Sequence, residues 1–255
     1  IALFIGTMAL AIEGMLLPAI SNLHANKKEN EIRTLVHDAE RYVALICIPL
    51  VAMTIVWSSE IILVFLSKEF LPASNILKIL ALVALVRVLN RPWSVALRGS
   101  DRPDLTSILS ILSSILSIFL MLILVPKRIP QLGLENLFGL GGEGAAYAVL
   151  ISEITVGLSL RILSYKYLEI LPKSNFFVQM IVATMVGIFM WQVQETITVD
   201  RWFELFFMSG LGGLLFLSIL LMLGSFTKKD FNFFWETLNP KSMKQYVGEE
   251  LKRDR

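Results

Sequence analysis

Two arginines stand four residues apart in the apolar stretch ALVALVRVLNRPWSVALRGS, which begins at Ala81. A charge at the centre of a bilayer costs about 2.5–3.5 kcal/mol on insertion scales, so such residues mark a water-filled cavity, an anionic ligand or an internal ion pair. The guanidinium group of arginine is planar and can donate two parallel hydrogen bonds, so it is well suited to binding a pyrophosphate. Residues at helical spacings of three, four, seven and eleven share one face. The polar residues of this face are Arg87, Asn90, Arg91, Ser94 and Arg98.

Two carboxylates lie at comparable depth in other apolar runs, Glu13 in the first run and Glu153 in the fifth. Arg161 follows Glu153 by two turns, which makes it a third candidate cation at membrane depth. Carboxylates inside membranes recur in ion relays, so Glu13 and Glu153 are candidates for coupling a proton or cation. The alternative is structural, namely an ion pair with Arg87 or Arg161. The same alternative, with snorkelling to the membrane surface, applies to Arg91, whereas Arg98 is interpreted as a snorkelling or loop charge.

The remaining polar residues point to no further chemistry. His24 and His37 stand in unrelated contexts, and Cys47 is the only cysteine, so we expect no metal site and no cofactor. No nucleophile–base arrangement and no phosphate-binding glycine loop occurs, and we therefore expect a protein that is not an enzyme. Small hydroxyl side chains follow one helical seam of the fourth run, where they favour close helix packing or, alternatively, line a cavity. They are Ser107, Ser110, Ser114 and Ser117.

The elements that carry these residues are predicted to be membrane helices. The 255 residues are 55% hydrophobic, and apolar runs of about 20 residues recur, which is the length that crosses a hydrocarbon core. The fold class is therefore all-α, a polytopic membrane protein, since barrel strands are half as long and alternate. The predicted spans are residues 1–24, 42–66, 74–98, 104–125, 143–168, 176–195 and 202–226.

The distribution of lysine and arginine predicts the orientation of these spans. One set of alternate connections, with the C-terminal tail, carries fifteen basic residues, whereas the other set carries four. Cytoplasmic loops are enriched in basic residues, so the first set and the C-terminus are predicted to be cytoplasmic. The charged segment Asn26–Tyr42 is predicted to form a separate helix at the cytoplasmic interface.

The chain is predicted to be part of a longer protein, because it starts with an isoleucine inside an apolar run and shows no signal peptide. The predicted organisation is a five-span lobe over residues 1–170, two further spans over 171–226 and a cytoplasmic tail over 227–255.

Three stretches together resemble one family of transporters. MLLPAISNLHANKKENEIRTLVHDAERYVALICIPL (Met15–Leu50), ILKILALVALVRVLNRPWSVALRGSDRPDL (Ile76–Leu105) and GEGAAYAVLISEI (Gly142–Ile154) resemble polysaccharide flippases of the multidrug/oligosaccharidyl-lipid/polysaccharide exporter superfamily. The resemblance covers residues 15–170 well, and the last two spans match it only in number and length.

The resemblance implies the C-terminal half of a fourteen-helix protein with two lobes that rock around a central cavity. Members move lipid-linked oligosaccharides across the cell membrane, and basic cavity residues meet the lipid phosphates. In this chain the resemblance assigns phosphate binding to Arg87 and Arg91, and less directly to Arg161. Asn90 and Ser94 are the expected polar residues of the cavity wall. The implied partners are a polyprenyl-linked oligosaccharide, membrane lipid and an N-terminal lobe, without nucleic acid. The alternatives are a drug or cation exporter of the same superfamily and a membrane glycan polymerase or ligase.

Overall fold

The structure is a computed structural model that describes residues 2–128, 137–171, 175–196, 199 and 201–226. Within these residues it contains eight α-helices and one 3-10 helix, and no β-strand. The elements are α1 (Ala2–Ala25), α2 (Glu29–Val56), α3 (Ser58–Phe65), η1 (Lys68–Ala73), α4 (Ser74–Gly99), α5 (Pro103–Leu124), α6 (Gly141–Leu168), α7 (Asn175–Thr196) and α8 (Trp202–Met222). The predicted all-α fold class is therefore confirmed.

Five segments of the described chain are long and apolar enough to cross a membrane. They are Glu29–Val56, Lys68–Gly99, Pro103–Leu124, Gly141–Leu168 and Trp202–Met222. The prediction of a polytopic membrane protein is confirmed. Helix covers most of each of the seven predicted spans, and the spanning role of α1 and α7 stays a prediction. The predicted tail over 227–255 lies outside the described residues.

One predicted boundary is wrong. The segment Asn26–Tyr42 does not form a separate interfacial helix, because α2 runs without a break from Glu29 to Val56. A single buried series along α2 explains this continuity, since it crosses the expected boundary at helical spacing. Its members include Ile32, Val36, Glu40, Val43 and Cys47. The predicted span 42–66 is instead interrupted at Trp57, after which the short helix α3 begins.

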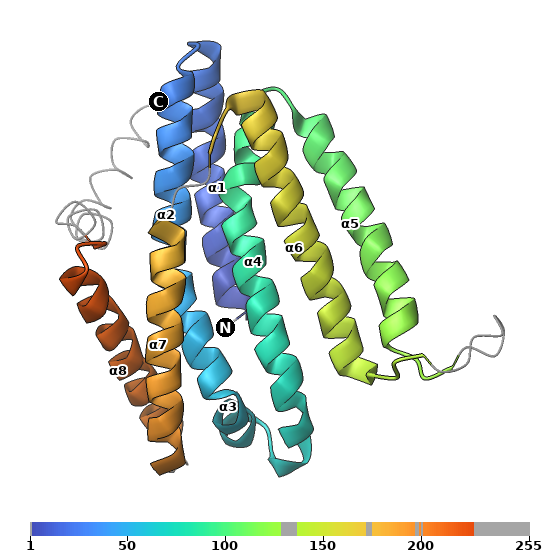
Figure 1. Ribbon diagram of the computed structural model, residues 1–255, viewed down its shortest axis with the longest axis vertical. Coiled ribbons are helices and arrows are strands. Elements are labelled where there is room, and N and C mark those ends of the chain that lie inside the picture. Colours follow the sequence, from blue (N-terminus) through green and yellow to red (C-terminus); the bar gives the residue numbers. More distant parts are fainter. Residues whose placement is uncertain (1, 129–136, 172–174, 197–198, 200, 227–255) are drawn as a thin grey trace, which may run out of the picture.

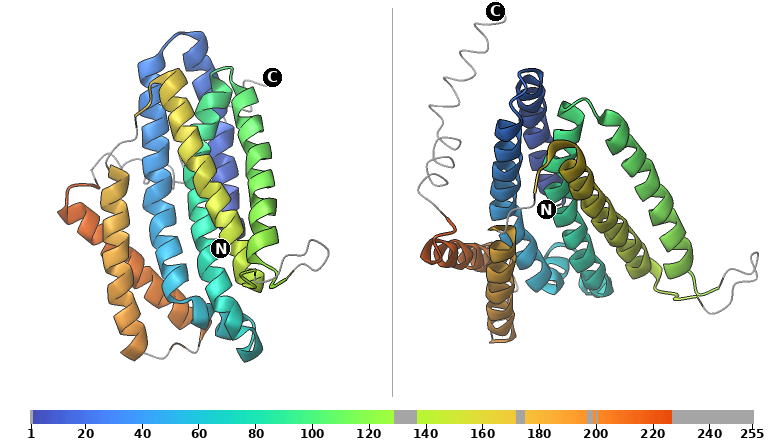
Figure 2. Two further views of the ribbon diagram at one scale, coloured as in Figure 1. Left: turned by 45° about the vertical axis from the view of Figure 1, so that its right-hand side comes forward. Right: turned by 45° about the horizontal axis from the view of Figure 1, so that its top comes forward.

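Helices α2 and α4 stand at the centre of the bundle. Helix α4 packs against α1, α2 and α6, while α2 also packs against α7 and α8 (Figure 1). Helix α5 lies at one edge, packed mainly on α6, and no residue of it is buried. In both further views α7 and α8 stay on the opposite edge of the bundle from α5 (Figure 2). The charged residues of α4 are therefore held between helices on either side.

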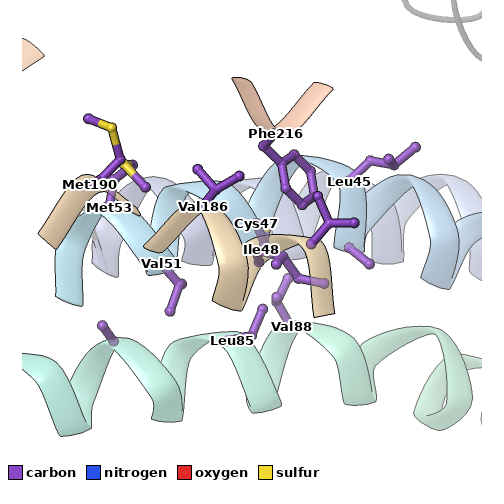
Figure 3. Close-up of a cluster of buried hydrophobic side chains, with 14 of the residues drawn as sticks. Leu45, Cys47, Ile48, Val51, Met53, Leu85, Val88, Val186, Met190 and Phe216 are labelled. Atoms are coloured by element: carbon purple, nitrogen blue, oxygen red, sulfur yellow. The ribbon is translucent and has the colours of Figure 1, made fainter. Parts of the chain in front are cut away.

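Two apolar cores hold the bundle together. The larger core joins α2, α4, α7 and α8, with Ile48, Leu85, Val186 and Phe216 meeting across the four helices (Figure 3). The smaller core joins α1, the start of α2, the second half of α4 and the end of α6 around the fully buried Trp93. Lipid tails are as apolar as these side chains, so shape complementarity and van der Waals packing provide the specificity of association.

Close helix approach at two positions of α6 requires glycine. A Cβ atom added to Gly144 would lie 2.6 Å from the carbonyl oxygen of Leu124, at the end of α5. A Cβ atom added to Gly157 would collide with the side-chain amide of Asn90 on α4. Small residues allow helix backbones in membranes to approach in this way. Gly157 therefore sets the spacing between α4 and α6 where the charged residues lie.

Candidate functional site

The candidate site lies along a partly exposed strip of α4 between α1 and α6. Its polar residues are Arg87, Arg91, Ser94 and Arg98, separated by steps of three or four. Residues at these steps stay on one side of an α-helix. The side chains of Arg87 and Arg91 remain 54% and 36% exposed, although α4 is otherwise the most enclosed part of the bundle. The strip is thus a row of accessible cations on a helix expected to span the membrane.

Arg87 binds Glu153 of α6. Its Nε and Nη2 atoms both donate to the same oxygen, Oε1 of Glu153, at 2.9 and 2.7 Å. Within the described chain, Nη1 of Arg87 and Oε2 of Glu153 take part in no hydrogen bond. The guanidinium thus keeps donor capacity while half of its surface remains accessible. This pairing also brings the deep carboxylate of α6 against the deepest arginine of α4.

Arg91 and Arg98 share the second deep carboxylate, Glu13 of α1. Nη1 of Arg91 donates to Oε2 of Glu13 at 2.9 Å, and Nη1 of Arg98 donates to Oε1 at 2.7 Å. The two arginines lie seven residues, or two turns, apart on the same side of α4, and the single carboxylate between them contacts both. Nε and Nη2 of Arg98 are buried and find no hydrogen-bond partner among the described residues. The Glu13 cluster therefore leaves guanidinium donors unused, as the Arg87 pair does.

A third charge pair, behind the strip, is more enclosed. Nη2 of Arg161 donates to Oε1 of Glu40 on α2 at 2.7 Å, and Nη1 donates to Oδ1 of Asn90 at 3.1 Å. The Arg161 guanidinium also lies 5.2 Å from the ring centroid of Trp93. Nδ2 of Asn90 in turn donates to the backbone carbonyl of Glu153 at 3.0 Å. This network of hydrogen bonds joins α2, α4 and α6 on the side of α4 that is enclosed by its neighbours.

The structure separates the predicted site residues into two groups. Arg87, Arg91 and Ser94 lie on the strip, together with the carboxylates Glu13 and Glu153 that reach it. Asn90 does not line an open side of α4 as expected, because it is 6% exposed and lies between α4 and α6. Arg161 is likewise engaged within the helix packing, on Glu40 and Trp93. The sequence left two roles open for these carboxylates, coupling of a proton or cation and an ion pair with Arg87 or Arg161. Glu153 does pair with Arg87, whereas Glu13 pairs with Arg91 and Arg98.

Sequence reasoning missed Glu40 and undervalued Arg98. Glu40 was assigned to a separate charged helix at the membrane surface, yet it occupies a buried position of α2. The regular spacing of Ile32, Val36 and Val43 around it is the signal that places it inside the bundle. Arg98 was interpreted as a snorkelling or loop charge, whereas it shares Glu13 with Arg91.

Two further observations concern the remaining polar residues. In the described chain no group of three histidine, cysteine or acidic residues could hold a metal ion. Ser107, Ser110 and Ser114 are exposed on α5, and Ser107 and Ser114 donate to carbonyls of their own helix. Within the described structure, these three serines therefore do not form the interface with a neighbouring helix that their seam predicted.

The chain was compared with known proteins. A model of the MatE family matches residues 1–123. A solved structure titled lipid II flippase MurJ, inward closed conformation, superposes with a TM-score of 0.60 at 19% sequence identity. The superposition covers 86% of this chain and 46% of that protein, so the chain spans less than half the length of the flippase it matches. No curated protein sequence matches the chain.

These matches confirm the resemblance to the multidrug/oligosaccharidyl-lipid/polysaccharide exporter superfamily. The family match lies over α1, α2, α3, η1, α4 and most of α5, which include Glu13 and the whole arginine strip. The structural match extends the fold over most of the chain, while its low identity leaves the cargo open. Over most of the chain the described helices thus share the fold of the solved lipid II flippase.

Proposed function

We propose that the protein moves a lipid-linked oligosaccharide, or a related polysaccharide precursor, across the cell membrane by alternating access. In this proposal the chain is the C-terminal half of a two-lobed transporter, with its C-terminus in the cytoplasm. Residues 1–170 form one lobe, and an N-terminal lobe covers the arginine strip from the other side of a water-filled cavity. Residues 171–226 add two spans, and 227–255 form the tail.

The observation that carries this proposal is the half-exposed guanidinium of Arg87, which keeps free donor capacity while bound to one oxygen of Glu153. A diphosphate presents several oxygens at once and can occupy the fork of Arg87 while also meeting Arg91. Charge-assisted bonds of this kind are worth about 1.5–3 kcal/mol each. The strip carries three arginines against two carboxylates, so its net charge suits an anion.

Each strip residue then has a role. Arg87 and Arg91 contact the lipid phosphates, with Ser94 adding a polar wall between Arg91 and Arg98. Glu153 and Glu13 hold the guanidiniums in place between transport events, and their release on phosphate binding is where proton or cation coupling would enter. Arg161 and Asn90 position α4 against α6 and α2 and do not contact cargo. A drug or cation exporter would instead favour an acidic cavity, and the arginine excess argues against it.

Substitution of Arg87 tests this function in the full-length protein. Reconstituted into liposomes with a fluorescent polyprenyl-diphosphate oligosaccharide, the Arg87→Ala variant should flip the lipid about ten- to a hundredfold more slowly. Arg87→Lys should restore part of the rate, because a point charge lacks the donor fork. Lys166→Ala, which removes an exposed cation at the end of α6, serves as the matched control and should flip at the normal rate.

Protein quality is measured in parallel, by the fraction of monodisperse protein after extraction. An Arg87→Ala variant that folds normally and flips the lipid at the normal rate would show that Arg87 is not a ligand. If cationic dyes instead of the lipid moved across the liposomes, and did so faster in Arg87→Ala, the exporter function would replace the proposed one.

A further inference from the structure

A cavity lies on a different face of α4 from the arginine strip. It has a volume of about 530 Å³ and is bounded by α2, α4 and α7, in the half of the bundle nearer the start of α4. This volume falls within the range of about 300–1,000 Å³ typical of small-molecule sites. Helix α4 contributes Lys78, Leu82 and Leu85, which follow one face at steps of four and three. Most of the remaining wall is aliphatic.

Lys78 is the cation of this cavity. It is half-buried, and it forms neither a hydrogen bond nor an ion pair with any described residue. It lies four residues after Ser74, the first residue of α4, which places it about 6 Å along the helix axis from that end. A lysine at this depth reaches the level of lipid headgroups, where phosphate is its natural counterion. Glu60 of α3 forms no ion pair with Lys78 and does not line the cavity; its Oε1 accepts from Gln194 at 2.7 Å, and its buried Oε2 has no hydrogen-bond partner among the described residues.

Helix α7 leaves room in the opposite wall. A Cβ atom added to Gly187 would meet no heavy atom within 4 Å, although Gly187 lines the cavity. One turn further along α7, the half-exposed Trp191 borders the same cavity. Tryptophan is enriched where apolar chains meet lipid headgroups. The cavity thus combines an aliphatic interior, an aromatic edge and a single cation at one end.

We propose that this cavity binds an anionic phospholipid of the surrounding membrane, with one acyl chain between α4 and α7 and the phosphate on Lys78. Charge complementarity selects the anionic headgroup, and the aliphatic walls select the chain. The site does not depend on the proposed transport function. Lys78, Leu82 and Leu85 lie on a different side of α4 from Arg87 and Arg91, so phospholipid and cargo do not compete.

The test counts lipids bound to the full-length protein by native mass spectrometry, with phosphatidylglycerol and phosphatidylcholine as probes. Lys78→Gln should reduce bound phosphatidylglycerol about tenfold and leave phosphatidylcholine unchanged. Lys68→Gln is the matched control, because Lys68 is exposed at the same end of the bundle and contacts no described residue by hydrogen bond or ion pair. It should retain the phospholipid.

A second pair of variants tests the cavity without changing charge. Gly187→Leu fills the open wall and should displace the lipid, whereas Gly210→Leu, which extends from α8 into a separate groove and also meets no atom, should not. The proposal is wrong if Lys78→Gln and Lys68→Gln bind phosphatidylglycerol equally, or if Gly187→Leu leaves the bound lipid in place. Displacement of phosphatidylglycerol by polyprenyl diphosphate would assign the cavity to the cargo instead.

Discussion

Arg87 and Arg161 are the same residue type on neighbouring helices, but their surroundings suit them to different roles. Arg87 is 54% exposed and touches one carboxylate oxygen, whereas Arg161 is 24% exposed and is held by Glu40, Asn90 and the ring of Trp93. An arginine whose donors are shared among three helices fixes the positions of those helices. An arginine with one partner and an open side can exchange that partner for a ligand.

The comparison shows why membrane depth alone does not identify a ligand-binding charge. Both arginines carry the cost of a charge within a membrane helix, and both offset it with a glutamate. The useful distinction is how many helices the partners come from and how much of the side chain stays exposed. Arg87 meets one residue of one other helix and is 54% exposed, whereas Arg161 meets residues of both α2 and α4 and is 24% exposed.

The largest loss of stability is expected from breaking the enclosed ion pair between Arg161 and Glu40. Glu40→Ala leaves the Arg161 guanidinium without its carboxylate and should lower stability by about 3 kcal/mol. Thermal unfolding of the full-length protein in detergent measures this loss. The double variant Glu40→Leu with Arg161→Met should recover much of it, because neither charge then remains. An unchanged midpoint in Glu40→Ala would show that the pair does not hold the helices.

A smaller effect is expected from separating α4 and α6 by steric means. Gly157→Ala introduces a methyl group against the side-chain amide of Asn90 and should destabilise the protein by about 1–3 kcal/mol. Gly210→Ala is the matched control, since its added Cβ meets no atom within 4 Å. Both variants are compared by the same unfolding assay. Equal midpoints would mean that α4 and α6 separate without cost.

The smallest loss of stability is expected from breaking the ion pair between Arg87 and Glu153. Glu153→Gln should lower the unfolding free energy by about 1 kcal/mol, less than Glu40→Ala does, because the Arg87 side chain is 54% exposed and its guanidinium can reach solvent once the carboxylate is gone. The same substitution removes the carboxylate that competes for Arg87, so pyrophosphate should bind the full-length protein more tightly. Calorimetry with pyrophosphate measures this, and weaker binding than in the unchanged protein would contradict the role of Arg87 as a ligand.

Much of the fold followed from the sequence, because helix length and apolarity respond to the membrane before any packing is considered. Runs of about 20 apolar residues must close their backbone hydrogen bonds internally, so helix covers most of each predicted span, although the span 42–66 is divided between α2 and α3. Helical spacing also placed Arg87, Arg91, Ser94 and Arg98 on one side of α4, since that spacing is a local property of the helix, but it wrongly added Asn90, which is buried.

The sequence alone did not decide which partner each charge meets. Glu40 and Arg161 are 121 positions apart in the chain, and Arg91 and Glu13 are 78 apart, so their pairing depends on how α1, α2 and α6 pack around α4. The same packing turned Asn90 inward and left Arg87 open, although the two residues are three apart on one helix. A helix face is wide enough to include both environments, and only the position of the neighbouring helix separates them.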